Sequence, residues 1–580
     1  MTQTPRKTRK TRTAPRATQL PRRSYTGHAA SRGTALGLLH RTDPPTTTTP
    51  PAPAGTDDPG RLIAEAFDEV AAGLYELSVS LRERGEDEQA DIMEVNSYIA
   101  QDPGLRDEAV RLAVSGTPAA PAVRQAVDGQ AALIAALDDP ALAERAADIR
   151  QVGRRVLDRL LGRTGPAQDQ PLVLAAHEIG AADLLEPGRT VVAALSVTGG
   201  PNSHAAIVAR SLGIPLLLGI EGALLDLPDG QEVLVDSERA TAVTPPDDAE
   251  RTEARRAMAA AAALRLALAG ERDLPSTTLD GHHVVLRANA ATPADAHAAL
   301  RANADGIGLL RTELPFLEAR TWPTEEQHTA ALGPVLRALT GRTVTARTLD
   351  FADDKLPPFL SKGLQGGRLG RGLPLMLAEP RAFLAQFRAL LRTGADTGLR
   401  IMIPMVADVG ELRACRSLLD TAAAELALPA PPLGMMVELP EAVAAADELA
   451  READFFSIGS NDLTSRILDL DRRDPAATPA LGAHPAVLRA VARVVTAAHH
   501  HDRRVSVCGD AAAHPLVAPL LIGLGCDILS VAPAALDEVR ARVRRLEHGA
   551  CVSVAREALA CETHEEVRRL VLDHLTPRLP

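Results

Sequence analysis

A single histidine follows a glycine-rich turn in the segment 199–210. The turn reads Gly-Gly-Pro-Asn-Ser, and His204 opens an apolar stretch that favours a helix. Unpaired backbone N–H groups at a helix start carry partial positive charge, so they can hold a phosphate. An imidazole placed there can carry a phosphoryl group on its outer nitrogen while the turn steadies the anionic oxygens. In an isolated motif, a helix-capping histidine without chemistry would be the better interpretation.

A second set of polar residues lies in the C-terminal half of the chain, where short apolar segments alternate with helical patterns. Polar side chains gather at the carboxyl ends of six of these segments. Buried apolar strands have no structural need for charges at one end only, although a helix cap or a salt bridge explains any one of them. The polar residues at these ends are Asn289, Arg311, Glu313, Arg347, Asp350, Glu438, Asn461, Asp462, Cys508 and Asp510.

The residue types in this set match a particular chemistry. Arg311 and Arg347 present forked donors suited to phosphate and carboxylate, and Arg472 can supply a third cation from a loop. Glu438 and Asp462 offer the hard oxygen ligands that Mg²⁺ prefers. Cationic clamps and a metal are what phosphoryl transfer requires, because charge spreads over the moving oxygens.

Two further residues complete the predicted site. Asn461 can hydrogen-bond a substrate oxygen. Cys508 is a thiol at a strand end and a candidate proton donor, while a small buried apolar residue is an equally good interpretation of it. The whole set fits a small, multiply charged phosphate ester that also carries a carboxylate.

The elements that must position these residues form an alternating pattern of strands and helices. Eight such units in roughly 260 residues point to a closed (β/α)₈ barrel with its chemistry at the C-terminal strand ends. A large open parallel sheet is the alternative. The predicted strands cover 284–288, 306–311, 343–349, 400–405, 433–437, 455–459, 504–508 and 527–531.

The rest of the chain divides by composition and hydrophobic period into further parts, which makes the whole a multidomain α/β protein. Residues 1–42 hold many bases and no acid, so we expect a disordered tail over 1–56, with a first strand near 28–42 as the alternative. The other predicted parts are a helical bundle at 57–165, a small α/β domain around His204 at 166–246, a linker helix at 247–273, the barrel at 274–545 and C-terminal helices at 546–580.

Composition excludes several classes of function. The chain has 580 residues, a net charge of −12 and only 2% aromatic residues, which argues against nucleic-acid binding. Five scattered cysteines fit free thiols in a reducing compartment better than a disulfide framework. No apolar run is long enough to span a bilayer, so we expect no membrane insertion and a cytoplasmic location.

Several ordered segments resemble enzyme I of the bacterial phosphoenolpyruvate-dependent sugar phosphotransferase system, that is, the phosphoenolpyruvate–protein phosphotransferases. The resemblance covers almost everything after the expected tail. Its strongest segments are 199–219, 305–313, 347–350 with Asp354 and Lys355, 401–405, 434–438 and 454–464.

This resemblance implies a role for each candidate residue. His204 would be the phosphorylated histidine, and Cys508 would protonate the departing enolate to give pyruvate. Glu438 and Asp462 would bind Mg²⁺. The residues that would bind phosphoenolpyruvate are Arg311, Arg347, Asn461, Asp462 and Arg472.

The resemblance also implies the partners and the overall reaction. The helical part would dock a small histidine-containing phosphocarrier protein (HPr), and the barrel would form a homodimer. The phosphoryl group of phosphoenolpyruvate would pass to His204 and then to the carrier's histidine, as the first step of sugar uptake phosphorylation. The barrel and the α/β domain would need a hinge between them, for which the linker helix is the candidate.

The sequence departs from the family's pattern near these residues. Asn202 stands where the family has threonine, and Ala352-Asp353 replaces a glycine pair. Between Gly370 and Pro374 one residue and one arginine are missing. A divergent paralogue that acts as a non-catalytic regulator is therefore the alternative of another class. A pyruvate–phosphate dikinase or phosphoenolpyruvate synthase relative is a weaker one, because no nucleotide-binding domain or glycine-rich ATP loop precedes His204.

Overall fold

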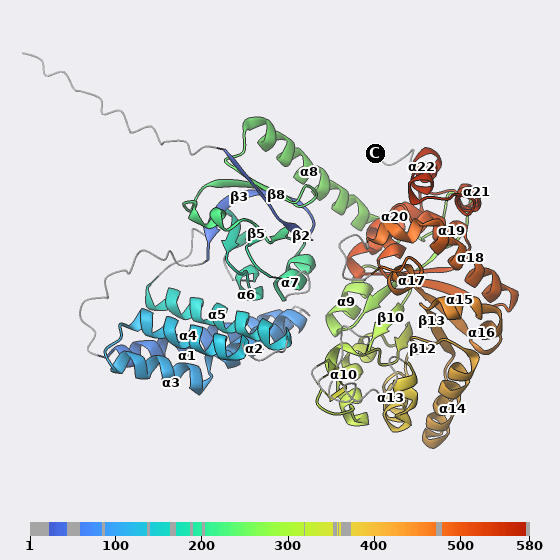
Figure 1. Ribbon diagram of the computed structural model, residues 1–580, viewed down its shortest axis with the longest axis horizontal. Helices are drawn as coiled ribbons and strands as arrows, with labels where there is room; N and C mark the ends of the chain where they lie inside the picture. The colour runs from blue at the N-terminus through green and yellow to red at the C-terminus, as the bar shows by residue number, and fades with distance from the viewer. Residues whose placement is uncertain are drawn as a thin grey trace, which may run out of the picture. The chain divides into compact units, whose positions relative to one another are not determined.

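The chain divides into two compact units, one made of residues 1–80 and 89–262 and the other of residues 81–88 and 263–580 (Figure 1). Each unit is described by itself below. The computed structural model describes residues 22–42, 58–83, 87–135, 140–162, 170–185, 189–199, 204–317, 319–351, 357, 359–360, 373–470 and 478–575.

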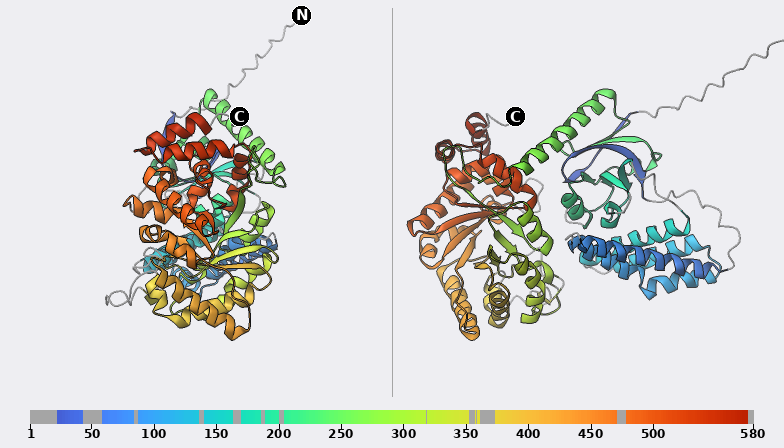
Figure 2. Two further views of the ribbon diagram at one scale, coloured as in Figure 1. Left: turned by 90° about the vertical axis from the view of Figure 1, so that its right-hand side faces the viewer. Right: turned by 180° about the vertical axis from the view of Figure 1, so that it is seen from behind.

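A bundle of helices makes up one part of the first unit, and its rods lie side by side in both figures (Figures 1 and 2). The apolar positions recur at helical spacing, so that Phe67, Leu74 and Leu105 fall on inner faces and are fully buried. Asp102 caps one helix by accepting hydrogen bonds from the next turn. The helices are α1 (Pro59–Glu83), α2 (Asp87–Ala100), α3 (Pro103–Val114), α4 (Ala119–Ala135) and α5 (Pro140–Leu160).

An eight-stranded mixed sheet makes up the other part of the first unit, in the order β1-β8-β7-β3-β4-β5-β6-β2. Neighbours β3 to β6 run parallel, whereas β7 and β8 pair antiparallel. Helices α6 (Ala181–Leu184) and α7 (His204–Leu212) belong to this part. The strands are β1 (Arg23–Thr26), β2 (His28–Ser31), β3 (Thr34–Arg41), β4 (Pro171–Ala176), β5 (Thr190–Ser196), β6 (Leu216–Leu218), β7 (Glu232–Asp236) and β8 (Thr241–Thr244).

The expected disordered tail was wrong for residues 22–42, which form three strands of this sheet. Strand β3 lies centrally, between β7 and β4, and buries Ala35 and Leu39. The prediction failed because basic residues surround this short apolar segment, and because the strands that pair with β3 lie far away in the sequence. The alternative of a first strand near 28–42 gives the right place for β2 and β3. Residues 1–21 and 43–57 are outside the described part.

The second unit contains a closed barrel of eight parallel strands, as predicted. Strand β9 pairs with β10 on one side and with β16 on the other, which closes the ring and excludes the open sheet. The strands are β9 (Val285–Ala290), β10 (Ile307–Arg311), β11 (Thr343–Arg347), β12 (Gly398–Ile403), β13 (Leu433–Val437), β14 (Phe455–Gly459), β15 (Arg504–Cys508) and β16 (Ile528–Val531).

Helices surround the barrel strands, and α8 (Asp248–Gly270) occupies the predicted linker segment. Figure 2 shows these helices around the strands from two further sides. They are α9 (Pro293–Arg301), α10 (Glu325–Ala338), α12 (Leu373–Leu377), α13 (Pro380–Thr393), α14 (Val409–Leu426), α15 (Pro440–Ala444), α16 (Ala446–Glu452), α17 (Ser460–Ile467), α18 (Pro485–His500), α19 (Ala518–Gly523), α20 (Leu536–Val543), α21 (His548–Ala558) and α22 (His564–Leu575). Short 3₁₀ turns are η1 (Gly222–Asp226), η2 (Leu314–Phe316), η3 (Pro479–Ala483), η4 (Asp510–Ala513) and η5 (Pro533–Ala535).

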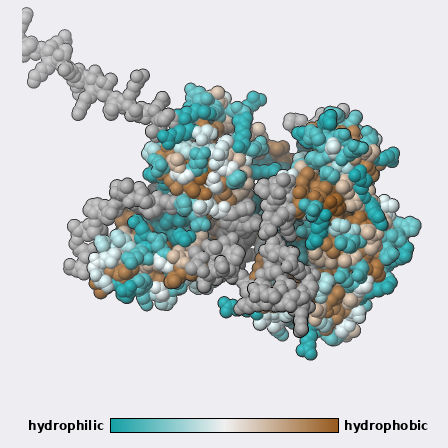
Figure 3. Space-filling model, in the orientation of Figure 1, coloured by the Kyte–Doolittle hydropathy of each residue, from teal (hydrophilic) through white to brown (hydrophobic). Residues whose placement is uncertain are grey.

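The main core of the second unit lies between strands and helices, and a smaller cluster fills the inside of the barrel. Leu309, Met402, Met436, Phe455 and Cys508 form this inner cluster. On the outer surface, hydrophilic residues are interspersed with apolar ones (Figure 3). None of the helices that the structure describes combines the length and the hydropathy that a bilayer crossing needs.

A recurring hydrogen bond joins neighbouring strands at the end of the barrel where the strands begin. Three aspartates lie one or two residues before β10, β14 and β16, and each accepts a hydrogen bond from a backbone N–H at the start of the preceding strand. Each of these bonds is 2.7–2.8 Å long. The three pairs are Asp305 with Leu286, Asp454 with Leu433, and Asp527 with Val505.

Candidate functional site

A cavity of 260 Å³ lies at the carboxyl ends of the barrel strands. Five residues to which the sequence assigned a role line it from four different strands or their following turns. They are Arg311, Arg347, Asn461, Asp462 and Cys508. The same cavity is lined by Asn289, Glu313, Asp350, Ser460 and Asp510.

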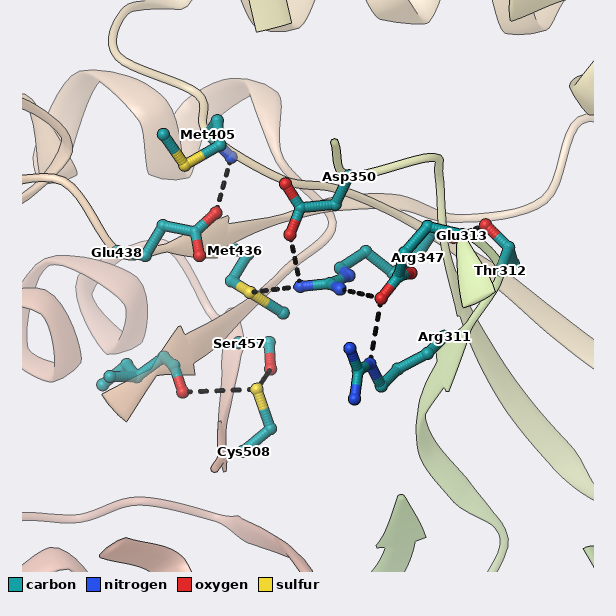
Figure 4. A network of polar contacts seen from close by, with 11 residues as sticks. Arg311, Thr312, Glu313, Arg347, Asp350, Met405, Met436, Glu438, Ser457 and Cys508 are labelled. Atoms are coloured by element: carbon teal, nitrogen blue, oxygen red, sulfur yellow. Dashed lines mark hydrogen bonds and ion pairs between the residues drawn. The ribbon is translucent and has the colours of Figure 1, made fainter. Parts of the chain in front are cut away.

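Two arginines at neighbouring strand ends share one carboxylate. Glu313 Oε1 accepts a hydrogen bond from Arg347 Nη2 at 2.8 Å and from Arg311 Nε at 2.9 Å (Figure 4). Asp350 Oδ2 lies 2.8 Å from Arg347 Nη1. Arg347 is therefore held from two sides, whereas the described residues bond Arg311 through its Nε alone, and 32% of its side chain is exposed.

Burial sharpens the electrostatics of this group. Although burial opposes the charged form, the nearby carboxylates of Asp350 and Glu313 raise the pKa of Arg347. Burial also opposes ionisation of Glu313, but Arg347 and Arg311 lower its pKa below the ordinary value. Arg347 and Glu313 are thus both charged at neutral pH.

Glu438 follows β13 and does not line the cavity directly. Its Oε1 accepts a 2.6 Å hydrogen bond from the backbone N–H of Met405, a residue with a positive φ of 56° (Figure 4). Burial and the negative charge of Asp350 raise the pKa of Glu438 to about 8. Sequence reasoning had placed this carboxylate at the strand end but could not give its direction.

The acidic residues of the site fit a divalent cation. The pKa of Asp350 is raised, first by burial, and the charges of Glu313 and Asp462 add to this. Asp350 Oδ1 is buried and has no hydrogen-bond partner among the residues that the structure describes. Carboxylates that repel one another and retain a free buried oxygen form the donor set that suits a hard cation such as Mg²⁺. Glu438 and Asp462 remain the predicted ligands.

Cys508 ends β15 with its side chain directed into the inside of the barrel. Ser457 Oγ donates to its Sγ at 3.6 Å, and the Sγ lies 3.5 Å from the carbonyl oxygen of Ile458 (Figure 4). Burial raises the pKa of the Cys508 thiol to about 11. The sulfur therefore keeps its proton at neutral pH, as a proton donor must.

Asn461 is fixed by a two-way contact across the mouth of the barrel. Its Nδ2 donates to Asp510 Oδ2 at 3.1 Å, and its Oδ1 accepts from the Asp510 N–H at 3.2 Å. The turn between Cys508 and Asp510 needs Gly509, which has φ +95°. A Cβ on Gly509 would lie 2.5 Å from Ser460 Oγ.

His204 is the first residue of α7 in the other unit. The helix buries Ala205, Ala206 and Val208 against its own domain, so that its first turn is anchored. The preceding Gly199 has φ +115°, a conformation that favours glycine. Asn202, together with the rest of 200–203, lies outside the described residues.

Other predicted features also fall outside the described residues. Arg472 lies in the segment 471–477, and Ala352-Asp353 lies in the segment 352–356. Residues 361–372 include most of the stretch between Gly370 and Pro374. These positions remain predictions from the sequence.

Glu313 and Asp350 are site residues to which sequence reasoning assigned no role. Both were noted as polar residues just after strand ends, the same signal that selected Arg311 and Arg347. What the sequence could not provide is their direction: both carboxylates face the Arg347 guanidinium.

Comparison with protein families places three adjoining matches along the chain. Residues 26–145 match the model described as "PEP-utilising enzyme, N-terminal", and residues 168–240 match "PEP-utilising enzyme, mobile domain". Residues 266–548 match "PEP-utilising enzyme, PEP-binding domain". The first match begins at the strand segment that composition alone had assigned to a tail.

Similar curated proteins extend over most of the chain. The multiphosphoryl transfer proteins of Xanthomonas campestris and Rhodobacter capsulatus are each 38% identical to it, over 94% and 83% of the chain. The chain spans 66% and 59% of the length of these two relatives. The phosphoenolpyruvate-protein phosphotransferase of Staphylococcus carnosus is 35% identical over 76% of the chain and 79% of its own length. On these matches, the chain belongs to the phosphoenolpyruvate-protein phosphotransferase family of PEP-utilising enzymes.

Proposed function

We propose that the protein transfers the phosphoryl group of phosphoenolpyruvate to His204 and from there to the histidine of a small phosphocarrier protein, HPr. Pyruvate is released, and the transfer is the first step of sugar uptake phosphorylation. One observation carries the proposal: a single cavity joins two arginines, a set of buried carboxylates and a protonated thiol. The arginines would bind the anionic substrate, the carboxylates would hold a metal ion, and the thiol would donate a proton.

The arginines bind and orient the substrate. Arg311 and Arg347 offer N–H donors to the phosphate and carboxylate oxygens, and Asn461 donates to a further oxygen. Arg472 adds a third cation from its loop. Glu438 and Asp462 hold Mg²⁺, which offsets negative charge on the phosphate oxygens when it is bound.

The imidazole of His204 attacks the phosphorus, and the bond from phosphorus to the enol oxygen breaks. The electron pair of that bond stays on the oxygen as the enolate of pyruvate. Cys508 then gives its proton to the methylene carbon, which completes pyruvate and leaves a thiolate that regains a proton from solvent. A thiol with a pKa of about 11 is neutral before this step.

The rest of the proposal concerns partners and location. The helical bundle α1–α5 docks the carrier protein, and the protein forms a homodimer through the barrel. We place the reaction in the cytoplasm, because all five cysteines are free thiols and four of them are buried.

Incubation of the pure protein with labelled phosphoenolpyruvate and Mg²⁺ tests the proposal. One acid-labile, base-stable phosphohistidine should form, and it should be absent from the His204→Ala variant. Addition of a candidate carrier protein should then remove the label from the wild type. A protein that acts only as a regulator would take up no label, and this result would refute the proposal.

A further inference from the structure

Three side chains that the proposed reaction does not use come together on the outside of the barrel. Asp447 lies in the first turn of α16, His500 ends α18, and His501 follows it directly. One ligand atom from each lies within 4.8 Å of the others. His501 Nε2 is 3.0 Å from Asp447 Oδ1, and the rings of His500 and His501 stand nearly perpendicular, with centroids 4.9 Å apart.

The cluster is separate from the phosphoenolpyruvate site. His500 and His501 lie just before β15, at the end of the barrel where the strands begin. Glu438 and Cys508, in contrast, stand at the opposite ends of their strands. A ligand bound at one end of the barrel therefore does not touch the other.

The donor set is that of a transition-metal site. Two imidazole nitrogens and one carboxylate oxygen suit Zn²⁺ and its neighbours, whereas Mg²⁺ prefers oxygen ligands alone. Asp447 and His500 are exposed and His501 is half-buried, so solvent can provide a fourth ligand. Three protein ligands with an open position is a common arrangement for zinc.

The neighbours of the cluster orient its carboxylate. Arg451 Nη2 lies 2.6 Å from Asp447 Oδ2 and therefore occupies the oxygen that does not face His501. Outer-sphere hydrogen bonds of this kind fix the orientation of metal ligands. The adjacent His499 takes no part, because its Nε2 lies 3.1 Å from Asp527 Oδ2.

We propose that Asp447, His500 and His501 form a binding site for a divalent transition-metal ion of the Zn²⁺ class. The ion joins α16 to the end of α18 and thereby crosslinks two helices of the barrel wall. Without it, the three residues are joined only by an exposed hydrogen-bond contact between Asp447 and His501, which contributes little to stability.

Metal titration of tag-free, dialysed full-length protein tests the site. Zn²⁺ is titrated against a chromophoric chelator in excess Mg²⁺, which keeps the carboxylates of the phosphoenolpyruvate site occupied. Wild-type protein should bind Zn²⁺, and Co²⁺ in its place should give the visible absorption of a tetrahedral complex. His500→Gln, His501→Gln and Asp447→Asn should each weaken binding at least about tenfold.

His499→Gln is the matched control, since it removes the third member of the same histidine run but leaves the cluster intact. It should bind Zn²⁺ as the wild type does. Zn²⁺ should also raise the melting temperature of the wild type and of this control, but not of His501→Gln. The proposal is overturned if the wild type binds no Zn²⁺ under these conditions, or if His499→Gln loses binding as His501→Gln does. Unchanged binding in all three cluster variants overturns it too.

Discussion

Glu313 and Arg347 form a buried ion pair in which Oε1 and Nη2 lie 2.8 Å apart, and the same oxygen holds Arg311. Glu313 is fully buried, so its role depends on what it holds. One carboxylate thus sets the distance and the angle between two guanidinium groups at the mouth of the barrel. We expect it to act as a positioning residue for substrate binding.

Substitution Glu313→Gln keeps the shape of the side chain but removes its charge. Loss of one charge-assisted hydrogen bond costs about 2 kcal/mol, which corresponds to about a thirtyfold rise in KM for phosphoenolpyruvate. Initial rates of pyruvate formation at varied phosphoenolpyruvate concentration measure this KM. Glu325→Gln is the control, because Glu325 also holds two arginines, Arg388 and Arg392, outside the cavity. Equal KM values in the two variants would contradict a positioning role.

Substitution Cys508→Ala removes the proposed proton donor. The variant should bind phosphoenolpyruvate normally but form pyruvate at least about 100-fold more slowly, since general acid catalysis contributes that much or more. A coupled assay for pyruvate measures the rate, and protection against thermal unfolding measures binding. Cys526→Ala is the control, because Cys526 is equally buried but lies before a strand start. Wild-type turnover in Cys508→Ala would exclude the thiol from the reaction.

The raised pKa of Glu438 predicts how pH acts on metal binding. In the metal-free protein this carboxyl is protonated below about pH 8, whereas in the unfolded chain its pKa is near the ordinary value of 4.5. Its contribution to stability is therefore present at low pH and is lost as pH rises toward 8. A cation needs the ionised form, so Mg²⁺ should raise the melting temperature more at about pH 9 than at about pH 6. In Glu438→Gln this pH dependence should largely disappear; if it persists, another group titrates.

The turn after β15 contains a glycine whose substitution should lower both stability and activity, whereas a matched glycine elsewhere should affect stability alone. Gly509 and Gly525 both have φ +95°, so alanine at either position should cost about 1–3 kcal/mol of stability. Only at Gly509 would the new Cβ press on Ser460 and Asn461. Gly509→Ala should therefore lower kcat, while Gly525→Ala should melt earlier with kcat unchanged. Denaturant unfolding and pyruvate assays measure the two effects, and equal kcat values in both variants would contradict this reading of the turn.

The barrel could be predicted because its strands are short apolar runs with clear ends. Strands β13, β14 and β15 match the expected residues, and the closed barrel that eight such units favoured over an open sheet is confirmed. The strands of residues 22–42 could not be predicted in this way. Strand β1 pairs with β8, Arg23 opposite Thr244, and a pairing of such sequence separation leaves no local pattern.

The site was predictable by residue type and place, but not by direction. Polar residues after strand ends identified Arg311 and Arg347, because parallel strands bring these ends together. Glu438 also follows a strand end, but its carboxylate accepts a hydrogen bond from the Met405 N–H and does not line the cavity. The role of Glu313 is equally invisible in the sequence, because a glutamate after a strand can as well cap a helix or face solvent. Packing decides between these outcomes.

The aspartate hydrogen bonds at the strand starts lie at the end of the barrel opposite to the candidate site. Asp305, Asp454 and Asp527 each join two neighbouring strands at that end, so these three bonds do not depend on the residues at the opposite end. The connections at that opposite end can therefore change in sequence or length without breaking the three aspartate bonds. In the sequence, 352–353 and 370–374 fall in the connection between β11 and β12, so these departures from the family pattern leave all three aspartate bonds in place.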